Sequence, residues 1–194
     1  MLRQRQFWLF IALAELIVLL TVSWGLIVNR HEVARYEGNY ETMLRNQVTI
    51  LFTAAYDNEK LIKRLIAGEI LSLEEGRKLR EGTLTFSNSF GNLHSLVIQR
   101  LGEPPEKLSM EPAVIAYTMT QFLDKKVLLP NSDSLQIKGM EKQIQAMHQI
   151  HQQWIEALGG GKSVPDPHRW KEIAEELSIG TKMKSLDLEA ILYR

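Results

Sequence analysis

Residues 7–28 read FWLFIALAELIVLLTVSWGLIV, and this stretch decides how the rest of the chain is interpreted. It carries a single charged residue, Glu15, and it follows a short tail that contains Arg3 and Arg5. At about 1.5 Å per residue, a helix of this length spans the roughly 30 Å hydrocarbon core of a bilayer. The sequence therefore predicts one transmembrane helix over residues 7–28, after a cytoplasmic tail over residues 1–6.

A cleaved signal peptide is the alternative interpretation of an N-terminal apolar run. This run is longer than the about 7–15 apolar residues of a signal peptide, and no A-x-A cleavage site follows it. We therefore expect a retained, single-pass anchor in the cell membrane, with Trp8 and Trp24 near the two interfaces. The basic tail favours a cytoplasmic N-terminus and an extracytoplasmic C-terminal domain, although basic residues also follow the run.

The composition of the chain argues against several functional classes. Its 194 residues include 23 basic and 23 acidic side chains, so the net charge is zero. No block of like charge is present, which argues against nucleic-acid binding. The chain has no cysteine, and this excludes disulfides, thiolate zinc sites and thiol nucleophiles. The absence of cysteine also fits an exported bacterial domain.

Beyond the apolar run, hydrophobic residues recur at spacings of three and four, which is typical of helices. The first such stripe predicts a helix from Val33 to Ala67-Gly68, with Gly38-Asn39 as a possible weak point. Gln47 and Asn58 are polar residues within this coiled-coil-like stripe, and we expect them to fix register or the choice of a bundle partner. The stripe consists of Tyr36, Tyr40, Met43, Gln47, Ile50, Ala54, Asn58, Leu61 and Leu65.

The remaining pattern predicts further helices with short connections. A second helix runs from the Ser72–Glu75 capping box to about Leu101, and a third covers residues 111–127, with Pro112 in its first turn. A fourth covers about residues 133–158. A short helix then runs from Asp166-Pro167 to about Ser178, where Gly180 ends it, and an amphipathic segment covers residues 186–192. The predicted fold class is all-α. The transmembrane helix leads into an antiparallel bundle of about four main helices, residues 29–161, followed by a short helical C-terminal tail, residues 162–194.

Glu15 is the first candidate site. A carboxylate in the bilayer core costs about 3 kcal/mol on insertion scales, so such residues usually face a partner helix or a polar cavity. Ala14, Thr21 and Gly25 lie on a stripe of small residues that permits close helix packing. We expect this face to contact a membrane protein partner or a second copy of the chain. The alternative is a protonated Glu15 that hydrogen-bonds to its own backbone or to water.

A metal site is a weaker hypothesis. His148 and His151 are three residues apart on the fourth predicted helix, and His94 on the second is the obvious third ligand. His151 falls on the buried stripe, so we favour a structural role for these residues. The sequence predicts no metal and no cofactor.

The pattern as a whole favours a non-enzymatic, membrane-anchored interaction protein of a bacterial envelope, which assembles with itself or with a membrane partner. One alternative is an extracytoplasmic bundle that captures a small molecule among Tyr117, Phe122 and Trp154. The layout is similar to the sensing halves of bacterial chemoreceptors and sensor kinases in architecture alone, since no motif is shared. A metal-dependent enzyme is the remaining alternative.

Overall fold

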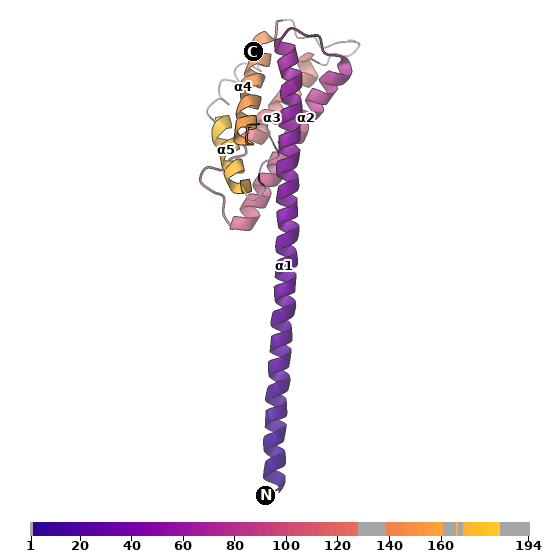
Figure 1. Ribbon diagram of the computed structural model, residues 1–194. Helices are drawn as coiled ribbons and strands as arrows, with labels where there is room; N and C mark the ends of the chain where they lie inside the picture. Colours follow the sequence, from indigo (N-terminus) through magenta and orange to yellow (C-terminus); the bar gives the residue numbers. More distant parts are fainter. Residues whose placement is uncertain (1, 128–138, 161–165, 167–168, 183–194) are drawn as a thin grey trace. The chain divides into compact units, whose positions relative to one another are not determined.

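The computed structural model describes residues 2–127, 139–160, 166 and 169–182. Their side chains are described from residue 19 onward, except at residues 126, 127 and 182. The chain divides into two compact units, Met1–Thr42 and Met43–Arg194. The regular elements of the described residues are all helices (Figure 1), which confirms the predicted all-α class. They are α1 (Leu2–Ile66), α2 (Leu73–Leu101), α3 (Glu111–Phe122), the π-helix η1 (Leu123–Val127), α4 (Glu141–Ala157) and α5 (Trp170–Lys182).

The first unit is a single stretch of α1. The helix passes through Gly38-Asn39 without a break, and the Thr42 hydroxyl donates to the Gly38 carbonyl at 2.8 Å. Among the residues whose side chains are described, no helix is both long and apolar enough to cross a membrane. Residues 7–18 of the predicted span lie outside that description, so the transmembrane helix stays a prediction.

The second unit has one hydrophobic core. Figure 1 shows α2, α3, α4 and α5 gathered beside the C-terminal part of α1. Trp154 of α4 stacks on Phe86 of α2, with ring centroids 4.0 Å apart and an angle of 12° between the planes. This helical bundle agrees with the sequence pattern. The largest fully buried side chains include Trp154, Phe86, Phe90, Leu44, Leu51, Ile62, Leu79, Leu93, Ile115 and Met119.

The ends of α2 follow the predicted signals. The Ser72 hydroxyl accepts from the Glu75 amide at 3.2 Å, and the Glu75 carboxylate accepts from the Ser72 amide at 2.8 Å. These two bonds form a capping box, which satisfies backbone donors that the first helical turn leaves unpaired. At the other end, Gly102 adopts a left-handed φ of 78°, a conformation that costs glycine little. Pro112 lies in the first turn of α3, as predicted.

Four predicted helix boundaries need correction, the first being the start of the last helix, which is Trp170 and not Asp166-Pro167. The third helix is α-helical only to Phe122, and its last turn is the π-helix Leu123–Val127. Residues 133–138 lie outside the described residues, and Gly139 has a φ of +84°, so α4 begins only at Glu141. The expectation that Gly180 ends the last helix is wrong, because α5 continues to Lys182. The backbone at Gly180 lies close to α4: a Cβ there would be 3.9 Å from Gln153. The predicted segment 186–192 lies outside the described residues.

Candidate functional site

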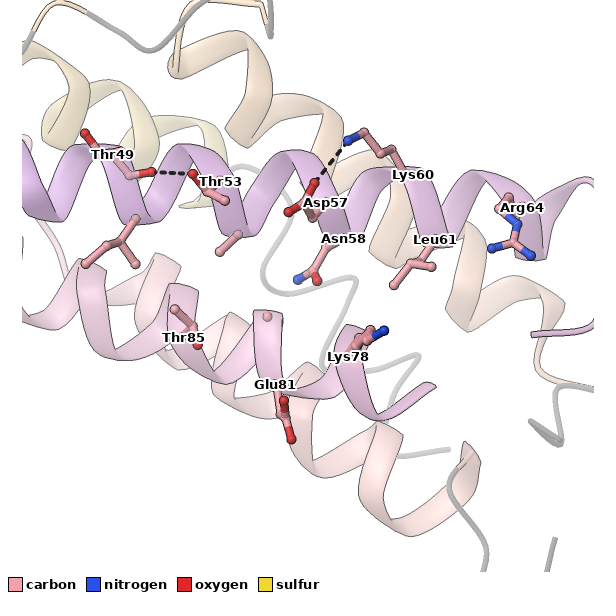
Figure 2. Close-up of a pocket in the computed structure, with 13 residues that line it drawn as sticks. Thr49, Thr53, Asp57, Asn58, Lys60, Leu61, Arg64, Lys78, Glu81 and Thr85 are labelled. Carbon is pink, nitrogen blue, oxygen red and sulfur yellow. Dashed lines mark hydrogen bonds and ion pairs between the residues drawn. The ribbon is translucent and has the colours of Figure 1, made fainter. Parts of the chain in front are cut away.

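A groove of about 740 Å³ lies between the C-terminal part of α1 and the first half of α2. Its floor is apolar because Ile50, Ala54 and Leu61 of α1 line it opposite Gly82 of α2. Figure 2 shows Asn58 and Leu61 pointing from α1 towards α2. The groove therefore offers an elongated apolar surface between two helices, a shape that suits the apolar side of another helix.

The two ends of the groove differ in charge. At one end, Thr49 and Thr53 donate their hydroxyl protons to the Arg45 and Thr49 carbonyls at 2.9 and 3.0 Å. Across from them on α2 lies Thr85. Since the donors on α1 are already used within the helix, this end presents a neutral surface.

The other end carries ion pairs. Asp57 bonds Lys60 at 3.1 Å, and Lys78 bonds Glu74 at 2.7 Å. Arg64 bonds two carboxylates, those of Glu69 at 2.7 Å and Glu75 at 2.6 Å. The hydrogen bond from Arg64, together with the Ser72 backbone, lowers the pKa of Glu75 to about 2. The cations of the groove are thus neutralised by neighbours, and this end offers no anion site.

A buried polar cluster lies beneath the groove. His151 is fully buried, and its Nδ1 donates to the Met147 carbonyl at 2.9 Å. Burial lowers the pKa of His151 to about 4, with a contribution from nearby His148, so the ring is neutral and its Nε2 is an acceptor. The Asn58 amide donates to that Nε2 at 3.5 Å and to the Thr83 hydroxyl at 3.4 Å. The cluster joins α1, α2 and α4.

Gly82 of α2 lies directly against the Asn58 side chain of α1 beside this cluster. A Cβ at Gly82 would overlap the Asn58 side-chain oxygen, so this position needs glycine. The Thr83 hydroxyl in turn donates to the Leu79 carbonyl at 2.6 Å. Each donor of the cluster therefore has an acceptor, which is the condition for a buried polar group to specify packing without destabilising it.

Glu59, the next residue on α1, forms a second cluster. Its side chain is only 5% exposed, and its carboxylate accepts from His148 Nδ1 at 3.1 Å. Lys63 lies 3.1 Å from the other carboxylate oxygen. The hydrogen bond between Glu59 and His148 ties α1 to α4 at the edge of the core.

The metal hypothesis does not match this geometry. His151 uses both ring nitrogens within the fold, and His148 binds Glu59. Within the described part of the chain, no group of three or more His, Asp or Glu side chains is arranged to hold a metal ion. His94 on α2 is half-buried, and burial lowers its pKa.

The three aromatic residues expected to line a ligand cavity differ in their exposure to solvent. Trp154 is completely buried, and its indole N–H donates to the Thr181 hydroxyl at 3.0 Å. Phe122 is buried, whereas 51% of Tyr117 is exposed to solvent. Trp154 is therefore a core residue, and none of the three aromatic residues lines the groove between α1 and α2.

The predicted interaction residues lie in different surroundings. Glu15 and Ala14 lie outside the residues whose side chains are described. Thr21 is exposed, and a Cβ at Gly25 would meet nothing within 4 Å. Asn58 belongs to the buried cluster, while Gln47 is half-buried on α1. The role of Gln47 and Asn58 in register stays a prediction.

Sequence reasoning missed the groove and the partners of Asn58. The available signals were Asn58 and Gly82, a polar residue within an apolar stripe and a glycine inside a helix that otherwise has good capping. Neither signal reveals that the two residues meet, because their contact depends on how α1 and α2 pack. Comparison with protein families, curated proteins and solved structures finds no match to this chain.

Proposed function

We propose that this chain is a non-enzymatic, single-pass membrane-anchored protein of a bacterial envelope, whose bundle binds other helices. One observation carries the proposal: between Leu19 and Val28, large apolar side chains of α1 remain 40–70% exposed. Contiguous apolar surface of this kind is normally covered by a membrane or by a partner. The exposed side chains are Leu19, Leu20, Val22, Trp24, Leu26, Ile27 and Val28.

The surrounding sequence supports a lipid environment for this stretch. Glu15 is the only charged residue between Gln6 and Asn29, and Arg3 and Arg5 precede the run. A basic N-terminal tail favours the cytoplasmic side, which leaves the bundle outside the cytoplasm. Trp24 lies near the end of the run, where an interfacial aromatic residue is expected.

The second unit supports binding in preference to catalysis. The polar groups of its buried cluster are engaged with one another, as the Asn58, Thr83 and His151 contacts show. The groove between α1 and α2 presents an apolar floor and hydroxyl-bearing walls. Such a surface can receive an amphipathic helix, and it places no nucleophile beside a base.

The anchor is proposed to contact a second membrane helix through Glu15, Ala14, Thr21 and Gly25. The open space at Gly25 leaves room for the backbone of a neighbouring helix. Replacement Glu15→Leu should reduce the size of the complex extracted in mild detergent, while Glu15→Gln, which keeps a hydrogen-bonding group, should retain it. A complex of unchanged size in Glu15→Leu would contradict this contact.

Alkaline extraction of membranes tests the anchor itself. The full chain should stay in the membrane pellet after carbonate treatment. The double variant Leu19→Arg/Val22→Arg should be lost from the pellet, because each arginine near the middle of a span costs about 2.5–3.5 kcal/mol. The matched variant Leu19→Ala/Val22→Ala keeps the run uncharged and should remain in the pellet. Release of the unaltered chain by carbonate would contradict the proposal.

Protease treatment of intact protoplasts tests the orientation. A tag placed after Arg194 should be removed by added protease, since the bundle is proposed to lie outside the cytoplasm. Lysed cells serve as the control for accessibility of the tag. Protection in intact protoplasts and removal after lysis would instead place the bundle in the cytoplasm.

A further inference from the structure

We infer that a second copy of this chain packs in parallel along α1, through an uncharged face formed by the neutral end of the groove. This inference rests on the proposed function, because it names the partner that the membrane-anchored bundle binds. The face belongs to the second unit and is formed by exposed, uncharged side chains of α1 and α2.

The first observation is an uncharged face on α1. No formally charged residue occurs between Arg45 and Asp57, and 24% of the chain is charged overall. Met43 is 51% exposed and Ile50 is 38% exposed, with Gln47 between them at helical spacing. Arg45 lies five residues from Ile50, about 140° around the helix. The uncharged face consists of Met43, Asn46, Gln47, Ile50, Thr53 and Ala54.

The second observation is that α2 continues this neutral character. Between Glu81 and Arg100 it contains no Asp, Glu, Lys or Arg. Its exposed residues between Glu81 and Arg100 are amides and hydroxyls at spacings of three and four, which places them on one side of the helix. Thr85, the first of them, lines the groove together with Ile50 and Ala54. The exposed residues are Thr85, Asn88, Asn92, Ser95 and Gln99.

The charge pattern indicates which kind of partner fits the uncharged face. In a two-fold symmetric interface the same patch meets itself, so any charge near the axis faces a like charge. A face without charges avoids this repulsion, whereas it offers a charged partner no opposite charge to bind. The uncharged face therefore matches a second copy of itself better than it matches an acidic or basic partner.

Gln47 adds a polar contact at the centre of the face. Its side-chain oxygen is buried, yet it accepts no hydrogen bond from the part of the chain that the structure describes. A polar residue at one core position of a coiled coil can pair with its counterpart and fix the register. In a symmetric pair, the half-buried Gln47 side chains lie between the Met43 and Ile50 layers of the two copies, and a change of rotamer would let their amides pair.

The anchor fixes the direction and the extent of the pairing. Two copies that enter the same membrane from the same side present α1 in parallel and at equal depth, which raises their effective concentration. Asp57 limits the contact, since two Asp57 carboxylates near the axis would repel each other. The pairing is thus confined to the uncharged face.

Disulfide crosslinking in membranes tests the inference, and the chain contains no native cysteine. Oxidised Met43→Cys should give a product of twice the 22.3 kDa chain mass. Because a disulfide needs Cα atoms within about 7 Å, Met43→Cys should give on the order of tenfold more product than the control Arg45→Cys. Both positions are exposed on the same turn of α1, so a difference in the yield of crosslinked product reports which side of the helix faces the second copy.

A second variant distinguishes specific pairing from random collisions between chains in the membrane. Adding Ile50→Lys to Met43→Cys puts a charge into the face and should remove most of the crosslinked product, while the circular dichroism spectrum and melting temperature stay unchanged. Equal yields from Met43→Cys and Arg45→Cys, no product, or a product whose mass reveals another protein would each overturn the inference. Failure of crosslinking in a chain that resists carbonate extraction would contradict self-pairing alone and would leave the membrane anchor intact.

Discussion

Two stretches of the same helix, residues 19–42 and residues 43–66, differ in what their apolar side chains contact. In the first, apolar residues such as Leu20 and Trp24 are 61% and 70% exposed. In the second, Leu44, Leu51 and Ile62 are almost completely buried. Both stretches are helical, although only the second packs against a core. Substitutions in residues 43–66 should therefore be costly because the side chains are buried, whereas substitutions in residues 19–42 should be nearly neutral.

The two tryptophans give the largest expected contrast. Trp154 is fully buried against Phe86, so Trp154→Ala should lower the free energy of unfolding of the bundle by about 4 kcal/mol. Trp24 is exposed in the first stretch, and Trp24→Ala should change that free energy by less than about 0.5 kcal/mol. Chemical denaturation of the full chain in detergent, followed by circular dichroism, measures both. Similar losses in the two variants would show that residues 19–42 share the stability of the core.

Acid should destabilise the bundle through His151. Its pKa is about 4 in the fold and 6.5 without the fold, so the unfolded chain binds the proton more readily. Neutral His151 therefore contributes to the free energy of unfolding above about pH 6.5. This contribution is lost as the pH falls towards 4, by about 3 kcal/mol in total. Denaturation at several pH values measures the loss. The variant His151→Gln should show a smaller slope over this window; an identical slope would assign the loss to other groups.

Two asparagines extend the comparison. Asn58→Ala removes the donor to His151 and Thr83, and leaving these buried groups unpaired should cost about 2 kcal/mol. Asn39 is exposed in the first stretch, and Asn39→Ala should have almost no effect on the bundle. The denaturant midpoints of the two variants measure this difference in stability. Equal midpoints would mean that the buried amide does not contribute to packing.

Two glycines should give the smallest effects, with opposite signs. Gly82→Ala places a methyl group against the Asn58 side chain and should destabilise the bundle by about 1 kcal/mol, after the helix propensity of alanine is included. A Cβ at Gly38 meets nothing within 4 Å, so Gly38→Ala should raise the helicity of the first stretch. Melting temperature reports the first change and the amplitude at 222 nm reports the second. Stabilisation by Gly82→Ala would show that α1 and α2 can separate at this point.

Local signals in the sequence account for the features that were predicted well. The capping box at Ser72 and Glu75, the stop at Gly102 and Pro112 in a first helical turn depend on backbone groups within a few residues. Gly180 misled the prediction because glycine lowers helix propensity without preventing a helix, and α5 passes through it to Lys182. The π-helix Leu123–Val127 was also missed; Arg80 of α2 binds Asp124 in this turn at 2.9 and 3.1 Å.

The sequence by itself determined the helical class, most of the helix ends and the position of an apolar run, since these follow from periodicity and local hydrogen bonding. Only the tertiary structure decided that Asn58 meets Gly82 and His151, that Trp154 is core, and that a groove opens between α1 and α2. Those contacts join residues far apart in the chain, as the separation of 93 residues between Asn58 and His151 illustrates. Periodicity identifies which side of a helix is buried, but the packing of the helices decides which residues meet there.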